Sequence, residues 1–202
     1  MSKTIRIFTL VEDSRGQLAI HTIVKRLIDC TSLVCNCRLA HRVEMARAQK
    51  FKGPCNQSSR MQVKSLKVQA KMRDRIPLIL VFIDTDVYRD YDEMVERVCM
   101  HTREECESGL LYVIPVEHNL EHLLCRIMVA TNTVTGSCRD PEGTLSRLLG
   151  HKYEKTFADR LAPRLERSLS DCKVVASLAN NIKTLHAIAD VLCKLLCSES
   201  NT

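Results

Sequence analysis

Carboxylates follow two of the most apolar segments of this 202-residue sequence. Glu12 comes directly after the run IRIFTLV at residues 5–11, and Asp84 and Asp86 follow LILVFI at residues 78–83. Where a chain leaves a strand, alternate side chains point the same way, so Asp84 and Asp86 can face one cation. Carboxylate oxygens without a soft ligand nearby suit Mg²⁺ or Mn²⁺, and both ions commonly bind phosphate-bearing substrates. We therefore expect a divalent metal site, which Glu12 joins if the two runs form adjacent strands.

Short apolar runs alternate with helical patterns in the first half of the chain. A third run, LLYVIPV, occupies residues 110–116, and residues 32–37 are a candidate fourth strand. Apolar residues recur at helical spacing over residues 18–28 and 94–99. This alternation predicts an α/β fold with a Rossmann-like, mostly parallel central sheet flanked by helices. Such sheets bind ligands at the carboxyl ends of their strands, where the three carboxylates are expected.

The second half of the sequence is predicted to be mainly helical. Helical patterns cover residues 120–130, 156–169 and 174–196, with glycine-containing breaks between the first two. We expect an α/β core over residues 1–135, with a basic helical insertion at about 38–75. Residues 136–202 would form a helical C-terminal extension that packs on this core. The apolar face of residues 174–196 leaves a homodimer open as an alternative.

The formal net charge of +6 is unevenly distributed along the sequence. Residues 38–75 contain eleven Lys or Arg and two acids, whereas residues 84–107 contain nine acids and three Arg. A basic segment of this kind predicts binding to a nucleic acid backbone, and its single aromatic residue, Phe51, does not indicate base stacking. Solvated helices that contact an acidic protein are the alternative. The expected nucleic-acid contacts are Arg15, Arg60, Lys64, Lys67 and Lys71.

The eleven cysteines are irregularly spaced and odd in number, so we expect reduced thiols in a cytoplasmic protein. The sequence contains no run of 18 apolar residues, so it does not predict a membrane-spanning helix. A zinc site at Cys30, Cys35, Cys37 and His41 is a weaker alternative, because it lacks the paired C-x₂-C spacing. Cys193 and Cys197, one helical turn apart, are interpreted as packing residues.

Three short motifs together resemble the TOPRIM domain. They are VEDS at residues 11–14, FIDTD at residues 82–86 and PVEHNLEHLL at residues 115–124. The chain looks most like the compact TOPRIM-like relatives of the overcoming-lysogenization-defect nucleases. The helical segment from residue 140 to Lys155 is similar to the tail of these relatives, so the resemblance covers about residues 5–169. Asp13 stands where family members usually have Gly, and His122 where they usually have an aromatic residue.

The resemblance implies a Mg²⁺- or Mn²⁺-dependent nuclease that cleaves DNA or RNA, in the setting of a defence or toxin-like effector. Asp84 and Asp86 would hold the metal, with Asp90 as an outer ligand. Glu12 would bind a second metal or act as general base. Glu121 matches the glutamate of the third motif, and Lys155 matches a lysine that steadies the phosphate. An ATPase partner protein remains open.

A zinc metallopeptidase is the first alternative function. His118, Glu121 and His122 fit the H-x-x-E-H pattern, in which two histidines on one helical face bind Zn²⁺. Glu199 lies at the separation at which that class of peptidase supplies its third ligand, although it stands close to a polar terminus. The second alternative is a non-catalytic TOPRIM-like interaction module. Asp13 and His122, which differ from the usual residues of the family, would then indicate that catalytic activity has been lost.

Overall fold

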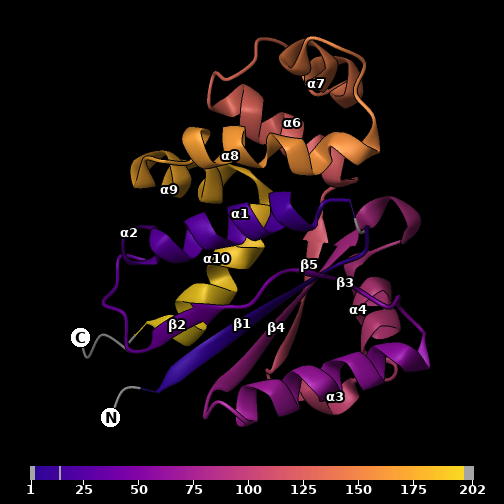
Figure 1. The fold of residues 1–202 in the computed structure, drawn as a ribbon, viewed down its shortest axis with the longest axis vertical. Coiled ribbons are helices and arrows are strands. Elements are labelled where there is room, and N and C mark those ends of the chain that lie inside the picture. The colour runs from indigo at the N-terminus through magenta and orange to yellow at the C-terminus, as the bar shows by residue number, and fades with distance from the viewer. Residues whose placement is uncertain (1–2, 14, 198–202) are drawn as a thin grey trace.

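The protein is built on a five-stranded parallel sheet in a computed structural model that describes residues 3–13 and 15–197 (Figure 1). The strand order is β2-β1-β4-β5, and the short β3 also pairs with β1. Helices cover both faces of the sheet and make up the C-terminal part, which confirms the predicted fold class. The strands are β1 (Thr4–Val11), β2 (Arg42–Met45), β3 (Gln49–Lys50), β4 (Ile76–Asp84) and β5 (Leu111–Val116).

The central strand β4 explains why its sequence is a continuous apolar run. Leu78, Leu80 and Phe82 belong to the core on one face of the sheet. The intervening Ile79, Val81 and Ile83 belong to a second core on the other face. A strand that is buried on both faces has no solvent side to be polar, so the usual alternation disappears.

Two unequal helical layers complete the cores. The smaller layer packs with Ile79 and Val81, and consists of α3 (Gln57–Lys71), α4 (Tyr91–Cys99) and α5 (Arg103–Glu107). The larger layer lies on the opposite face and carries most of the C-terminal part (Figure 1). Its helices are α1 (Gln17–Asp29), α6 (Leu120–Ala130), α7 (Pro141–Leu149), α8 (Ala162–Ser168), α9 (Cys172–Asn181) and α10 (Lys183–Leu196).

The C-terminal helices pack closely on the first half of the chain. Helix α8 contacts α1, and α10 contacts both β5 and α9. Leu185, Ile188 and Leu192 on α10 are almost fully buried in the core of the larger layer. In the described part of the chain, no helix has both the length and the apolar character needed to cross a membrane.

The segment after α1 differs from the prediction in two places. Residues 32–37 do not form a strand, because the chain continues into the short helix α2 (Thr31–Val34) and a turn at Asn36, whose φ is +48°. The basic segment contains the expected helix α3, but also β2 and β3 at the edge of the sheet. β2 is short and only partly buried, so its sequence RVEM lacks the apolar signal of an interior strand.

The prediction of reduced thiols is wrong for ten of the eleven cysteines, and Cys55 is free. Three of the disulfides join the region around α2 to α9 and to the end of α10. The two cysteines of each bond are 142 to 160 positions apart in the sequence. Only the fold brings such partners together, so their spacing along the sequence carried no signal. The disulfides are Cys30–Cys172, Cys35–Cys193, Cys37–Cys197, Cys99–Cys106 and Cys125–Cys138.

Candidate active site at the carboxyl ends of the strands

Glu12 and Asp84 lie side by side because β1 and β4 are neighbouring parallel strands. The backbone N–H of Glu12 donates to the carbonyl of Phe82 at 3.2 Å, which extends the ladder beyond the end of β1. In return, the backbone N–H of Asp84 donates to Oε2 of Glu12 at 3.3 Å. The expected adjacency of the first two carboxylates is therefore present.

Asp86 lies beyond the end of β4 in the 3₁₀ helix η1 (Thr85–Val87). The backbone N–H groups of Thr85 and Asp86 donate to the carbonyl of His118, at 3.1 and 3.2 Å. The N–H of His118 donates to the Thr85 hydroxyl at 2.9 Å. These bonds tie the exits of β4 and β5 together, and the exposed Asp86 stands at the rim of the site.

Glu121 enters the site from the first turn of α6 and is only 5% exposed. Asn119 caps this helix, because its side chain accepts from the N–H of His122 at 3.0 Å. The buried hydroxyl of Tyr153 lies close to Glu121 but has no well-formed hydrogen bond. Burial and the charge of Glu121 raise the pKa of Tyr153, so its hydroxyl keeps its proton.

Lys155 begins the 3₁₀ helix η2 (Lys155–Leu161), which is anchored beside the β1–α1 loop. The anchor is Asp159, whose Oδ1 accepts from the N–H groups of Leu18 and Ala19 at 2.8 and 3.2 Å. Asp159 thereby caps α1 from 140 residues away, a task that its own N-cap residue, Gly16, has no side chain to perform. The sequence offered no signal for this contact.

Gly16 is closely packed in this loop. A Cβ at this position would stand 2.0 Å from Cδ2 of Leu120, the first residue of α6. Its φ of −117° is open to any residue, so space rather than backbone conformation selects glycine here. The contact brings the loop after Glu12 against the start of the helix that carries Glu121.

Burial and neighbouring like charges raise the pKa of two of these carboxylates. The pKa of Asp84 rises from 3.8 to about 7, chiefly through burial and then through the charges of Glu12, Asp86 and Glu121. The positive charge of Lys155 lowers it. The pKa of Glu12 is also raised, with burial again the largest cause and the charge of Asp86 contributing. A cation placed among these groups would relieve both effects.

The donor set suits a hard cation, since every converging ligand is a carboxylate oxygen. The carboxylate oxygens nevertheless do not form a tight group. Among the described residues, the only three His, Cys, Asp or Glu ligand atoms within 4.8 Å of one another belong to Cys35, Cys37 and Cys197. Mg²⁺ usually keeps several waters between itself and its protein ligands, so carboxylates that do not touch one another can share one hydrated ion.

Asp90 does not turn toward this cluster. Its side chain accepts from the N–H of Glu93 at 2.8 Å and thereby caps α4. It also pairs with Arg89 at 2.9 Å on the exposed surface. These contacts hold the pKa of Asp90 below its ordinary value. The structure gives Asp90 a capping role, so we leave it out of the ligand set.

Three of the predicted nucleic-acid contacts lie far from the carboxylates. Lys64, Lys67 and Lys71 on α3 line a groove beside Ile76, the first residue of β4. Asp84 is the last residue of that strand, about 26 Å away at about 3.3 Å per residue. Lys67 also pairs with the buried Glu105 at 2.8 Å. The two remaining contacts, Arg15 and Arg60, are exposed in the β1–α1 loop and near the start of α3.

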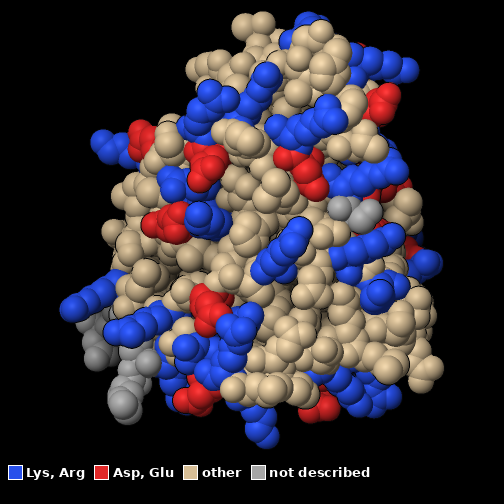
Figure 2. All heavy atoms as spheres, viewed as in Figure 1, with Lys and Arg blue, Asp and Glu red and all other residues tan. Residues whose placement is uncertain are grey.

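A large pocket adjoins the site instead, at the start of α6. Its volume is about 940 Å³, and it is lined by His118, His122, Arg126 and Arg139 among others. Arg126 is held by an ion pair with Glu117 and by the carbonyl of Asn181, whereas Arg139 is exposed. The H-x-x-E-H pattern groups the two histidines, but no motif or spacing in the sequence adds Arg126 or Arg139 to them. On the face that Figure 2 shows, Lys and Arg are spread over the surface with fewer Asp and Glu among them.

The peptidase pattern is not arranged as that chemistry needs. His118 precedes the N-cap of α6 and has a left-handed backbone with a φ of +62°, so the two histidines do not share a helical face. Their rings meet edge to face at 4.6 Å. Burial and the neighbouring His118 lower the pKa of His122. The charge of Glu121, by contrast, raises the pKa of Asp84 in the carboxylate site. Glu199 lies outside the described residues, as does Ser14 of the VEDS motif.

Comparisons with known protein families, with curated proteins and with solved structures find no match to this chain. The resemblance to TOPRIM proteins therefore stays a prediction from the three motifs. The chemistry that the site can perform is inferred from its geometry.

Proposed function

We propose that this protein is a metal-dependent phosphodiesterase that cleaves nucleic acid at the carboxyl ends of β1 and β4. The observation that carries the proposal is the adjacency of Glu12 and Asp84 at the ends of two paired strands, with Asp86, Glu121 and Lys155 near enough for their charges to act on Asp84. Several carboxylates that raise one another's pKa are costly to fold, and such clusters are typical of functional sites.

The expected ion is Mg²⁺ or Mn²⁺, held by Asp84 and Glu12, with Asp86 and Glu121 as further oxygen ligands. When bound, the ion would supply a Lewis acid that offsets charge on the phosphate and lowers the pKa of a bound water. The peptidase alternative gains no support, because His118 lies before α6 and, among the described residues, His118, Glu121 and His122 do not form a group of close metal-ligand atoms.

The chain's own groups have separable roles in this proposal. Glu12 accepts the proton of the attacking water, a role favoured by the raised pKa of its carboxylate. Lys155 lies close enough to Asp84 to lower its pKa, so its ammonium group can also offset charge on the phosphate oxygens. Tyr153 remains protonated beside Glu121, so its hydroxyl can act as a hydrogen-bond donor there.

The neighbouring pocket offers a path for the nucleic acid backbone. Exposed Arg139 lies on its lining, and His118 joins the pocket to the loop that carries Asp86. Backbone contacts of this kind neutralise phosphates without reading sequence. The groove at Lys64 and Lys71 lies beside the first residue of β4, and Asp84 ends that strand about 26 Å further on, so a substrate that reaches from this end of the sheet to the carboxylates must span several nucleotides.

The test is cleavage of single- and double-stranded DNA and RNA in Mg²⁺ or Mn²⁺. We expect the wild-type chain to cleave at least one of these substrates and a chelator to stop it. Asp84→Asn and Asp86→Asn should each lower the rate by about 10² or more. The matched control is Asp92→Asn, an exposed aspartate on α4 that should keep the wild-type rate. Cleavage that persists in a folded Asp84→Asn, Asp86→Asn double variant contradicts the proposal.

A further inference from the structure

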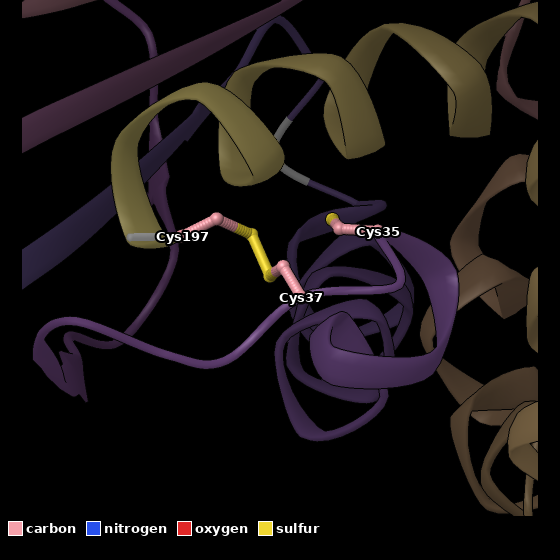
Figure 3. Close-up of side chains that lie close together, drawn as sticks. All are labelled: Cys35, Cys37 and Cys197. Carbon is pink, nitrogen blue, oxygen red and sulfur yellow. A yellow bond between two sulfur atoms is a disulfide. The ribbon is translucent and has the colours of Figure 1, made fainter. Parts of the chain in front are cut away.

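Four cysteines from distant parts of the chain meet at one place, where α2 faces the end of α10. Cys35 and Cys37 follow α2, while Cys193 and Cys197 lie one turn apart at the end of α10. Two disulfides join them, Cys35–Cys193 and Cys37–Cys197, with Cα separations of 5.4 and 5.8 Å. Figure 3 shows Cys35 beside the bond between Cys37 and Cys197.

The two disulfides adjoin so closely that three of their four sulfurs form one cluster. The sulfurs of Cys35, Cys37 and Cys197 all lie within 4.8 Å of one another, although Cys35 is bonded to neither of the others. The fourth sulfur, that of Cys193, is bonded to Cys35. In a tetrahedral zinc site the Zn–S distance is about 2.3 Å, which places sulfurs about 3.8 Å apart. Three of the sulfurs are thus already near this spacing, and Cys193 would complete the set by turning its side chain toward them once its bond to Cys35 is broken.

The backbone holds the cluster together by contacts other than the disulfides. The N–H of Ala40 donates to the carbonyl of Leu196 at 2.8 Å, and Leu39 forms an antiparallel bridge with Cys197. The left-handed Asn36 turns the chain between Cys35 and Cys37. All four cysteines are partly buried, so solvent reaches the site while protein surrounds most of it.

We propose that Cys35, Cys37, Cys193 and Cys197 bind one Zn²⁺ when their two disulfides are reduced. Each S–S bond breaks with two electrons and two protons from one equivalent of a dithiol, which is itself oxidised to a disulfide. The four thiols formed in this way release their protons as Zn²⁺ binds them as thiolates. The site shares Cys35 and Cys37 with the predicted set of Cys30, Cys35, Cys37 and His41, but Cys193 and Cys197 replace the other two because they are the bonded partners of Cys35 and Cys37. The metal and the disulfides are thus alternative links between α2 and α10.

The test is an anaerobic titration of the full chain with Co²⁺, after reduction by a dithiol and removal of the reductant. We expect the absorption bands of tetrahedral cobalt thiolate to saturate at one Co²⁺ per chain, and one equivalent of Zn²⁺ to displace it. Cys193→Ser with Cys197→Ser should abolish these bands. Cys99→Ser with Cys106→Ser is the matched control and should keep them, as should Asp84→Asn, which separates this site from the carboxylates.

Absence of thiolate bands in the reduced wild-type chain overturns the proposal, as does their full retention in the Cys193→Ser, Cys197→Ser variant. A second measurement covers the case in which that variant does not fold. Oxidation of the Zn²⁺-loaded wild-type chain by a small disulfide should release one Zn²⁺ as the two protein disulfides form. Zinc that stays bound after both of these disulfides have formed contradicts the proposal equally.

Discussion

Replacing Asp84 by Asn is expected to stabilise the metal-free protein at pH 8. The pKa of Asp84 is about 7 in the folded protein, against an ordinary value of 3.8. As pH rises between these values, the unfolded chain loses the proton while the folded chain keeps it. The free energy of unfolding then falls by up to about 1.4 kcal/mol per pH unit. Above pH 7 both states are ionised and the loss is complete.

The two pKa values set the size of the effect. The loss is about 1 kcal/mol at pH 4.5 and about 4 kcal/mol at pH 8. Asparagine has nearly the same shape and no charge, so it removes this pH dependence. The stability of Asp84→Asn relative to wild type should therefore increase by about 3 kcal/mol between pH 4.5 and pH 8.

Urea unfolding in the presence of a chelator, with disulfides intact, measures this difference at both pH values. Asp92→Asn on the exposed surface of α4 is the control, and its relative stability should change by less than about 1 kcal/mol. A relative stability of Asp84→Asn that is the same at both pH values would refute the proposed burial of like charges. Saturating Mg²⁺ should stabilise the wild-type chain more than the variant.

Three further substitutions test how the site is positioned. Asp159→Ala removes the side-chain cap of α1 and should lower the free energy of unfolding by about 1–2 kcal/mol in urea unfolding, with Asp159→Asn costing less. Gly16→Ala should cost about 1–3 kcal/mol, and a double-mutant cycle with Leu120→Ala should show that the two changes are not additive. Lys155→Met should lower the cleavage rate without unfolding the protein. Because Lys155 lowers the pKa of Asp84, this variant should also shift the acidic limb of the pH–rate profile to higher pH; an unshifted limb would contradict that coupling.

The sequence was sufficient for the central strands and for two members of the site. A strand buried on both faces leaves a continuous apolar run, as in β4, and the carboxyl ends of adjacent parallel strands must meet. Glu12 and Asp84 could therefore be paired without a structure. The edge strand β2 was missed because it is short and half-buried, and residues 32–37 were mistaken for a strand because short apolar runs are ambiguous.

Contacts between the two halves of the chain could not be predicted from the sequence. Asp159 caps a helix 140 residues earlier, and Cys37 bonds to Cys197 across 160 residues. Neither pair has a local signature, because the backbone path between the partners decides whether they meet. For the same reason the basic residues of α3 were assigned to the site, although the helix runs back toward the amino ends of the strands.

The most direct test of the proposed metal site is a crystal of the wild-type protein grown with Mn²⁺ and measured for anomalous scattering. We predict an anomalous peak at the carboxyl ends of β1 and β4, with carboxylate oxygens of Asp84 and Glu12 about 2.2 Å from it. The peak should be absent in Asp84→Asn under the same conditions. Mn²⁺ bound only elsewhere, or a wild-type site without a peak at saturating Mn²⁺, would contradict the proposed site.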